Sequence, residues 1–155
     1  MMKQPTSSPR RVSGVSLIEV MISVLILGVG MLGIAAMQTT ALRNNQSAMS
    51  RSQVVMQTYT ILDAMRANRD VALLGNYNTG GMMCTAPTGG SLVEKDQALW
   101  IGSLKSTISD ADSTCGAINC TDGNCKISVQ WDDSRAREAS GNGGAEQTIE
   151  TVTQL

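Results

Sequence analysis

Histidine and phenylalanine are both absent from this 155-residue chain, and aromatic residues make up only 3% of it. Without histidine, the chain cannot assemble a Ser-His-Asp or Cys-His catalytic group or a mixed Cys/His zinc site, so we do not expect an enzyme. Proline is also scarce, and none lies between Pro9 and Pro87. A long uninterrupted helix is therefore permitted across that interval. The length leaves room for one small domain besides any membrane segment.

Charge is missing from a long stretch near the amino end. Residues 20–37 contain no charged side chain, and Ser23 is their only hydroxyl. As a helix, these eighteen residues would be about 27 Å long, close to the ~30 Å hydrocarbon core of a bilayer. Lys3, Arg10 and Arg11 precede the stretch without an acidic residue, which favours a cytoplasmic amino end and export of the rest. A cleaved secretory signal fits poorly, because its apolar core runs only about 7–15 residues.

One acid, Glu19, lies at the start of this apolar stretch. A carboxylate in lipid costs a few kcal/mol, so acids within membranes usually have a partner. A plain single-pass anchor explains the apolar residues, but it explains neither Glu19 nor Gly14 at the end of the basic leader.

The run from Gly14 to Glu19, GVSLIE, resembles the type III signal of type IV pilins and type II secretion pseudopilins. In that family a membrane peptidase cuts after the glycine, on the cytoplasmic side, and methylates the new amino terminus. The resemblance therefore implies cleavage between Gly14 and Val15, N-methylation of Val15, and an assembly role for Glu19. The amine of Val15 on one subunit would neutralise Glu19 on a neighbour, removing the cost of burying either charge. The valine departs from the phenylalanine or methionine that is usual at this position.

Further blocks resemble a minor pilin of the same family, namely residues 16–21, 28–38, 65–70, 74–77 and 129–135. The resemblance implies a structural subunit that supports pilus assembly, twitching motility and adhesion in a Gram-negative bacterium. It also implies an inner-membrane anchor, a periplasmic head and no cofactor. The implied partners are prepilin peptidase, other major and minor pilins, and the inner-membrane assembly platform. A minor pseudopilin of a type II secretion system is the alternative, and a membrane-tethered periplasmic enzyme or metal-binding module is a third hypothesis.

We expect an α+β, type IV pilin-like fold in four parts: a cleaved leader at 1–14, a transmembrane helix half at 15–37, an amphipathic half at 38–70 and a head at 71–155. One helix is predicted from about Ser16 to Asn68. Its core-facing stripe is expected at Leu42, Ala48, Met49, Val55, Met56, Tyr59, Leu62 and Met65. Three glycines in the membrane half, Gly28, Gly30 and Gly33, favour either close helix packing or local melting.

The head contains fewer clear patterns. Apolar spacing predicts a helix over 94–108, and alternation predicts strands over 126–131 and 147–153, the first with Ile127, Val129 and Trp131 facing inward. Glycine-rich turns are expected at 121–124 and 140–144, and a further strand around 82–85. A long helix would thus pack on a small antiparallel sheet.

Four cysteines, Cys84, Cys115, Cys120 and Cys125, lie in the part predicted to be exported, where an oxidising compartment favours disulfides. Three pairings are possible. We weakly favour Cys120–Cys125, which would close the 121–124 turn and leave Cys84 for Cys115. A metal site on four thiolates is the less favoured alternative.

Other acidic groups suggest little chemistry. Asp132 and Asp133 are neighbours at a strand end and are interpreted as a solvated turn, and Asp110, Asp112 and Thr114 lack the glycine and glutamate of an EF-hand calcium loop. Without residues 1–14 the chain keeps nine basic and thirteen acidic residues, a formal balance of −4. No basic stripe is present, which argues against direct nucleic-acid binding.

Overall fold

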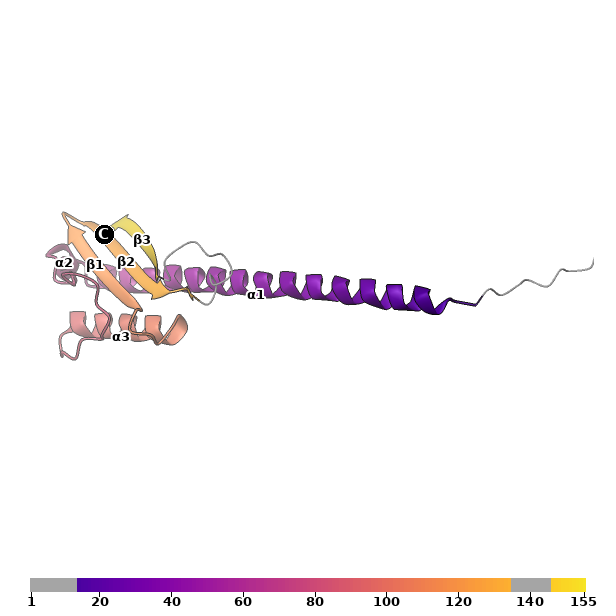
Figure 1. Cartoon of the computed structure of the whole chain (residues 1–155). Helices are drawn as coiled ribbons and strands as arrows, with labels where there is room; N and C mark the ends of the chain where they lie inside the picture. Colours follow the sequence, from indigo (N-terminus) through magenta and orange to yellow (C-terminus); the bar gives the residue numbers. More distant parts are fainter. Residues whose placement is uncertain (1–13, 135–145) are drawn as a thin grey trace, which may run out of the picture. The chain divides into compact units, whose positions relative to one another are not determined.

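The computed structural model describes residues 14–134 and 146–155. In chain order, the elements within these residues are α1 (Leu17–Ala67), α2 (Arg69–Leu73), α3 (Leu92–Thr107), β1 (Cys115–Thr121), β2 (Asn124–Asp132) and β3 (Glu146–Gln154) (Figure 1). The chain divides into two compact units, residues 1–39 and 40–155. A long helix followed by a small antiparallel sheet confirms the predicted α+β class. The predicted turn at 140–144 lies outside the described residues.

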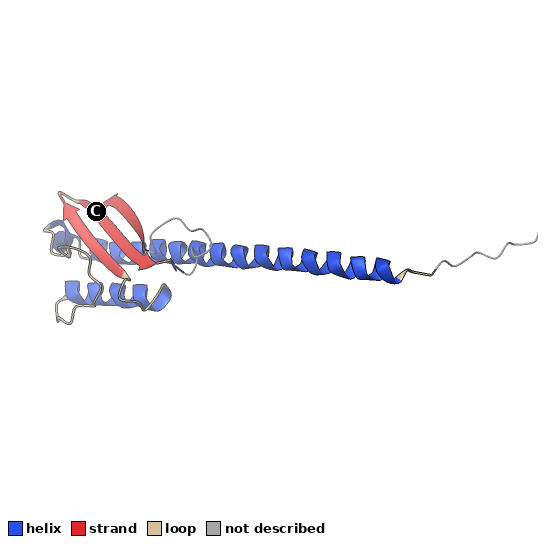
Figure 2. Cartoon of the chain, in the orientation of Figure 1, coloured by secondary structure: helices blue, strands red, loops and turns tan. Residues whose placement is uncertain are grey.

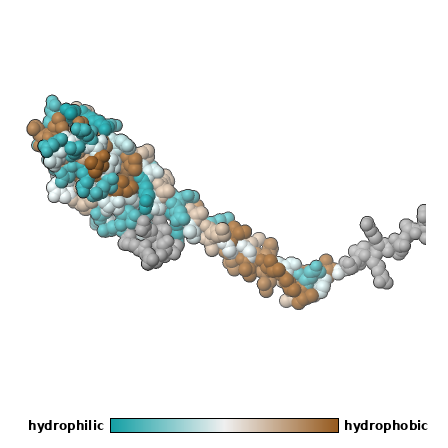
Figure 3. Space-filling model, turned by 90° about the horizontal axis from the view of Figure 1, so that it is seen from above, coloured by the Kyte–Doolittle hydropathy of each residue, from teal (hydrophilic) through white to brown (hydrophobic). Residues whose placement is uncertain are grey.

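Helix α1 confirms the single helix predicted from about Ser16 to Asn68. It is long and apolar enough to cross a membrane, and none of its most apolar eighteen-residue window is buried within the chain. Hydrophobic side chains coat this part of the helix (Figure 3). A surface of this kind is stable in lipid and costly in water, so the amino-terminal half of α1 is suited to a bilayer or to the interior of an assembly.

The carboxyl-terminal half of α1 packs on the head through a different face from the one that we predicted. The buried residues are Val54, Thr58, Ile61, Leu62 and Met65, whereas Leu42, Ala48, Met49, Val55, Met56 and Tyr59 are exposed. Of the predicted stripe, only Leu62 and Met65 face the core. The buried face was not predicted because it includes a polar residue, Thr58. The Thr58 hydroxyl donates a hydrogen bond to the Val54 carbonyl at 2.9 Å, so its burial costs little free energy.

The sheet is antiparallel with the strand order β1-β2-β3 (Figure 2). β1 and β2 are joined by Asp122-Gly123, whose φ angles of 51° and 79° suit the two-residue hairpin turn that this dipeptide favours. This hairpin confirms the predicted 121–124 turn, and β2 and β3 confirm the two predicted strands. β1 was not predicted. The strand expected around 82–85 is wrong, because only an isolated bridge between Met83 and Gly116 is present.

The core of the head lies between the carboxyl-terminal half of α1, helix α3 and one face of the sheet. Trp100 and Ile101 of α3 and the predicted inward residues of β2, Ile127, Val129 and Trp131, are all buried in it. α3 begins two residues before the predicted start. A capping box defines that start, in which the Ser91 hydroxyl accepts from the Glu94 amide while the Glu94 carboxylate accepts from the Ser91 amide.

Candidate processing and assembly site

The predicted cleavage bond lies just outside helix α1. Gly14, Val15 and Ser16 have no helical structure, and the helix begins at Leu17, with the Ser16 carbonyl accepting hydrogen bonds from the amides of Glu19 (3.0 Å) and Val20 (3.3 Å). The Val15 side chain is 72% exposed, and no atom lies within 4 Å of the place where a Gly14 side chain would begin. The Gly14–Val15 bond is therefore in an exposed, non-helical segment, the kind of backbone that a peptidase can bind.

Glu19 lies in the first turn of α1, and its side chain is exposed. The helix dipole favours an acid at this end. Within residues 14–134 and 146–155, the ion pairs are Asp63–Arg66, Lys105–Asp112 and Lys126–Glu150, so Glu19 has no basic partner there. The Ser23 hydroxyl donates to the Glu19 carbonyl at 2.7 Å and leaves the carboxylate untouched. The Glu19 carboxylate can therefore form an ion pair with a cationic group from outside this helix.

Three glycines follow Glu19 in the same apolar helix, Gly28, Gly30 and Gly33. No atom outside the helix backbone lies within 4 Å of any of their missing side chains. The backbone is consequently accessible at these positions, as close helix approach requires. The choice between packing and local melting stays a prediction.

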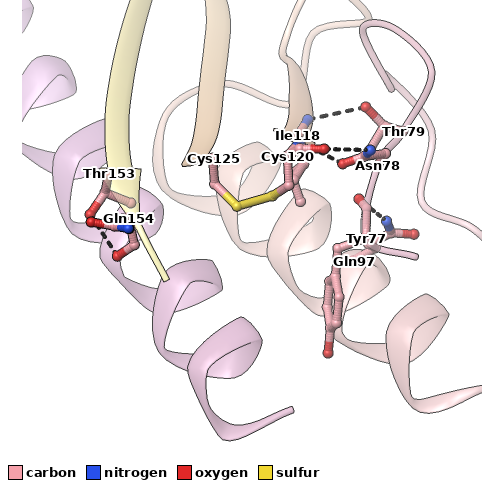
Figure 4. The surroundings of a disulfide bond; sticks show 9 residues. All are labelled: Tyr77, Asn78, Thr79, Gln97, Ile118, Cys120, Cys125, Thr153 and Gln154. Atoms are coloured by element: carbon pink, nitrogen blue, oxygen red, sulfur yellow. Dashed lines mark hydrogen bonds between the residues drawn. A yellow bond between two sulfur atoms is a disulfide. The ribbon is translucent and has the colours of Figure 1, made fainter. Parts of the chain in front are cut away.

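The four cysteines form two disulfides, Cys84–Cys115 and Cys120–Cys125, and none is free. Cys120 and Cys125 are directly opposite each other on β1 and β2, next to the hairpin turn. Figure 4 shows that bond beside the segment after α2, where the Asn78 side chain donates to the Cys120 carbonyl (3.1 Å) and accepts from the Cys120 amide (2.7 Å). The two bonds therefore attach both ends of β1 to other parts of the head.

The acidic residues that we considered for calcium are not gathered into a site. Asp112 forms an exposed ion pair of 3.8 Å with Lys105, and Thr114 is fully buried. Among the described residues, no group of three or more acidic or sulfur ligands could hold a metal ion.

The solvated turn predicted for Asp132 and Asp133 is wrong for Asp133, which is only 6% exposed and accepts a 2.6 Å hydrogen bond from the Ser47 hydroxyl of α1. Asp132 instead accepts from the Ser134 amide at 2.8 Å. The two carboxylates thus accept hydrogen bonds from different partners. Asp133, the buried one, lies directly after β2 and links that strand to α1. Sequence spacing could not find this contact, because it joins residues 86 positions apart.

The profile of the prokaryotic N-terminal methylation motif matches residues 9–35, which include Gly14, Val15, Glu19 and the first turns of α1. No curated protein and no solved structure matches the chain. A motif of this kind implies processing by prepilin peptidase and assembly with other pilins. Together with the apolar helix and the small antiparallel sheet, the match supports a structural subunit of the type IV pilin and pseudopilin family.

Proposed function

We propose that this chain is a minor pilin of a type IV pilus, similar to PilV. It is inserted in the inner membrane with its head in the periplasm, cut between Gly14 and Val15, N-methylated at Val15, and then added to the filament. Its action is structural, supporting the initiation and assembly of pili and thereby twitching motility and adhesion. The resemblance to PilV rests on blocks of sequence at 65–77 and 129–135 as well as on the leader.

The observation that carries this proposal is the exposed Glu19 at the start of an apolar membrane-length helix. Cleavage after Gly14 creates a cationic amine at Val15, four residues away along the chain. An acid in lipid is unfavourable alone, and the processed amine of a neighbouring subunit can neutralise it. Neutralisation on assembly would select one axial register between adjacent helices.

A second feature supports packing among several helices. The carboxyl-terminal half of α1 carries an exposed apolar stripe, formed by Leu42, Met49, Val55, Met56 and Tyr59. Leu42, Met49 and Met56 recur every seven residues, the spacing that lines one helix against another. Monomeric proteins rarely leave such a stripe in water, so we assign it to contacts between subunits in the filament.

The test replaces Glu19 with alanine and with glutamine in cells that make the filament, and Asp70→Ala serves as an exposed acidic control. Intact mass of the chain reports cleavage and methylation, and the sheared filament fraction reports incorporation. We expect both Glu19 variants to be cleaved after Gly14 yet to fall at least tenfold in the filament fraction, while Asp70→Ala behaves as the parent. Parental incorporation of Glu19→Ala, or a leader that remains attached in the parent chain, would refute the proposal.

The main alternative is a minor pseudopilin of a type II secretion system, because pseudopilins have the same kind of leader and apolar helix. Deleting the chain separates the two. Loss of surface pili with secretion intact supports the pilus assignment, whereas blocked protein secretion with normal pili supports the rival.

A further inference from the structure

The outer edge of strand β1 is closed by the chain itself. The backbone of Gly116 pairs with Met83, through hydrogen bonds of 2.8 and 3.0 Å. The Ile118 carbonyl accepts from the Thr79 amide (3.0 Å), and the Ile118 amide donates to the Thr79 hydroxyl (3.1 Å). The Asn78 side chain completes the series at Cys120 (Figure 4). Every second residue of β1, from 116 to 120, therefore has its outward backbone groups satisfied.

The opposite edge, along β3, is different. β3 pairs with β2 without a break from Glu146 to Gln154, and the next residue, Leu155, donates its amide to the Gly123 carbonyl at 2.9 Å. Because hydrogen-bonded and non-hydrogen-bonded pairs alternate along antiparallel strands, Thr148, Glu150 and Val152 direct their backbone groups away from β2. Residues 14–134 and 146–155 supply no hydrogen-bond partner for these groups. Figure 2 shows β3 at the margin of the sheet.

β3 has few of the devices that usually protect an edge strand, apart from the acids Glu146 and Glu150 on its exposed face. Its nine residues, EQTIETVTQ, contain no proline and no lysine, and its register with β2 has no bulge. The residues whose side chains alternate toward the core side, including Ile149 and Thr151, carry no charge. Natural proteins blunt long edges by such devices, because an unprotected edge pairs with other chains. An edge of this length, left regular while the opposite edge is covered, is suited to pairing.

We propose that the β3 edge binds an extended segment of a different subunit of the same filament, which adds a fourth strand to the sheet. The inference rests on the proposed function, because it places the chain in a filament with other subunits. The outward groups of Thr148, Glu150 and Val152 require an extended peptide as the ligand, since only a strand supplies donors and acceptors at this repeat. The binding segment carries a lysine or arginine opposite Glu146, because the exposed side chains of the strand include two acids.

A second copy of this chain is a poorer occupant. β3 holds Glu146 and Glu150 and no basic residue, so self-pairing would bring four acids to one edge. Among residues 14–134 and 146–155, Glu150 has a counterion, Lys126 at 3.0 Å, and Glu146 has none. The exposed side chain of Val152, 70% accessible, provides an apolar contact beside the acids.

The experiment places a photo-crosslinking amino acid at Val152 of the full chain in filament-forming cells, and at the exposed Ser106 of α3 as the matched control. Sheared filaments are irradiated, and the linked peptides are sequenced by mass spectrometry. We expect Val152 to capture a segment of another filament subunit that contains lysine or arginine, at a yield at least tenfold above Ser106. Equal yields at the two positions, or capture of a second copy alone, would overturn the proposal.

Two substitutions added to the Val152 probe test the kind of pairing. Thr148→Pro removes one outward amide without touching the ladder to β2, and Thr148→Ala is its control. The proline should lower the yield at least tenfold, and the alanine should leave it unchanged. Glu146→Lys keeps the backbone and should also lower the yield, so the charge argument stays testable if the proline variant fails to form its disulfides. An unchanged yield with Glu146→Lys contradicts the proposal. Failure here with normal incorporation of the parent chain leaves the pilin assignment intact.

Discussion

The Tyr77 hydroxyl donates a 2.6 Å hydrogen bond to Asp96 Oδ2 and accepts one of 3.3 Å from Asn68 Nδ2. The Tyr77 side chain is fully buried, and its carbonyl accepts from Gln97 Nε2 at 2.9 Å (Figure 4). One residue thus connects the end of α1 to α3. Burial, the hydrogen bond to Asp96 and the Asp96 charge together raise the pKa of Tyr77 above 10.0.

Tyr77→Phe should lower the free energy of unfolding by about 1.5–3 kcal/mol at neutral pH, because the variant loses the hydrogen bond to the Asp96 carboxylate and the one from Asn68. The parent should then lose stability more steeply than the variant above pH 10. The pKa of Tyr77 is higher in the folded state than in the unfolded state. The protonated hydroxyl therefore contributes its full stabilisation below the unfolded-state pKa, and this stabilisation is lost as the pH rises through the folded-state pKa. Urea unfolding in detergent, followed by the fluorescence of Trp100 and Trp131, measures both effects. Tyr59→Phe, on the exposed face of α1, should follow the parent; parallel pH curves for Tyr77→Phe would contradict the assignment.

Gly116→Ala should destabilise the head by about 1–3 kcal/mol, the range typical of overpacked cores. A methyl group at this position would overlap the Trp100 ring, which packs directly against the glycine. Gly102→Ala is the matched control, since nothing lies within 4 Å of its missing side chain on α3. That control should be neutral or stabilising by up to about 1 kcal/mol. The same unfolding assay compares the two, and equal stabilities would show that the Trp100–Gly116 packing is not tight.

Ser47→Ala should cost about 1.5–3 kcal/mol, because the Ser47 hydroxyl bonds to the buried Asp133 carboxylate. Ser52→Ala removes a hydroxyl that donates to the backbone of the same helix, at the Ala48 carbonyl. The control should change stability by less than about 0.5 kcal/mol. A large effect at Ser52, or none at Ser47, would contradict this account of how α1 is attached to β2.

Removing the two disulfides should have unequal effects. The Cys84–Cys115 bond closes a loop of 31 residues, and the Cys120–Cys125 bond closes one of 5. Loop-closure entropy gives about 3.7 kcal/mol for the first and about 2 kcal/mol for the second. Paired substitutions to alanine, compared by urea unfolding, test the order. The prediction fails if the Cys120–Cys125 pair proves the more costly to remove.

Much of the fold could be predicted because its signals are local. The absence of proline and the apolar period locate α1, alternation locates β2, and the Asp122-Gly123 dipeptide locates the hairpin. The start of α3 could also have been predicted from Ser91 and Glu94, because their spacing is that of a capping box.

The remainder depends on contacts that local patterns do not record. β1 has the sequence CGAINCT, in which glycine and two disulfide cysteines replace the usual alternation. The second half of α1 has two apolar faces, and the buried one includes Thr58. A prediction from hydrophobicity alone therefore assigned the exposed face to the core. At the candidate site, the leader and Glu19 are recognisable from sequence. The burial of Asp133 and the connections made by Tyr77 depend on partners brought together only by folding.

The Cys84–Cys115 bond has a mechanical consequence. Tension applied along the chain passes through the sulfur atoms and bypasses the 31-residue loop, which contains all of α3. At about 3.3–3.6 Å per residue, roughly 100 Å of contour is withheld from stretching. A head pulled from its ends therefore lengthens only by unravelling the segments outside this loop, and α3 stays unloaded until the bond is reduced.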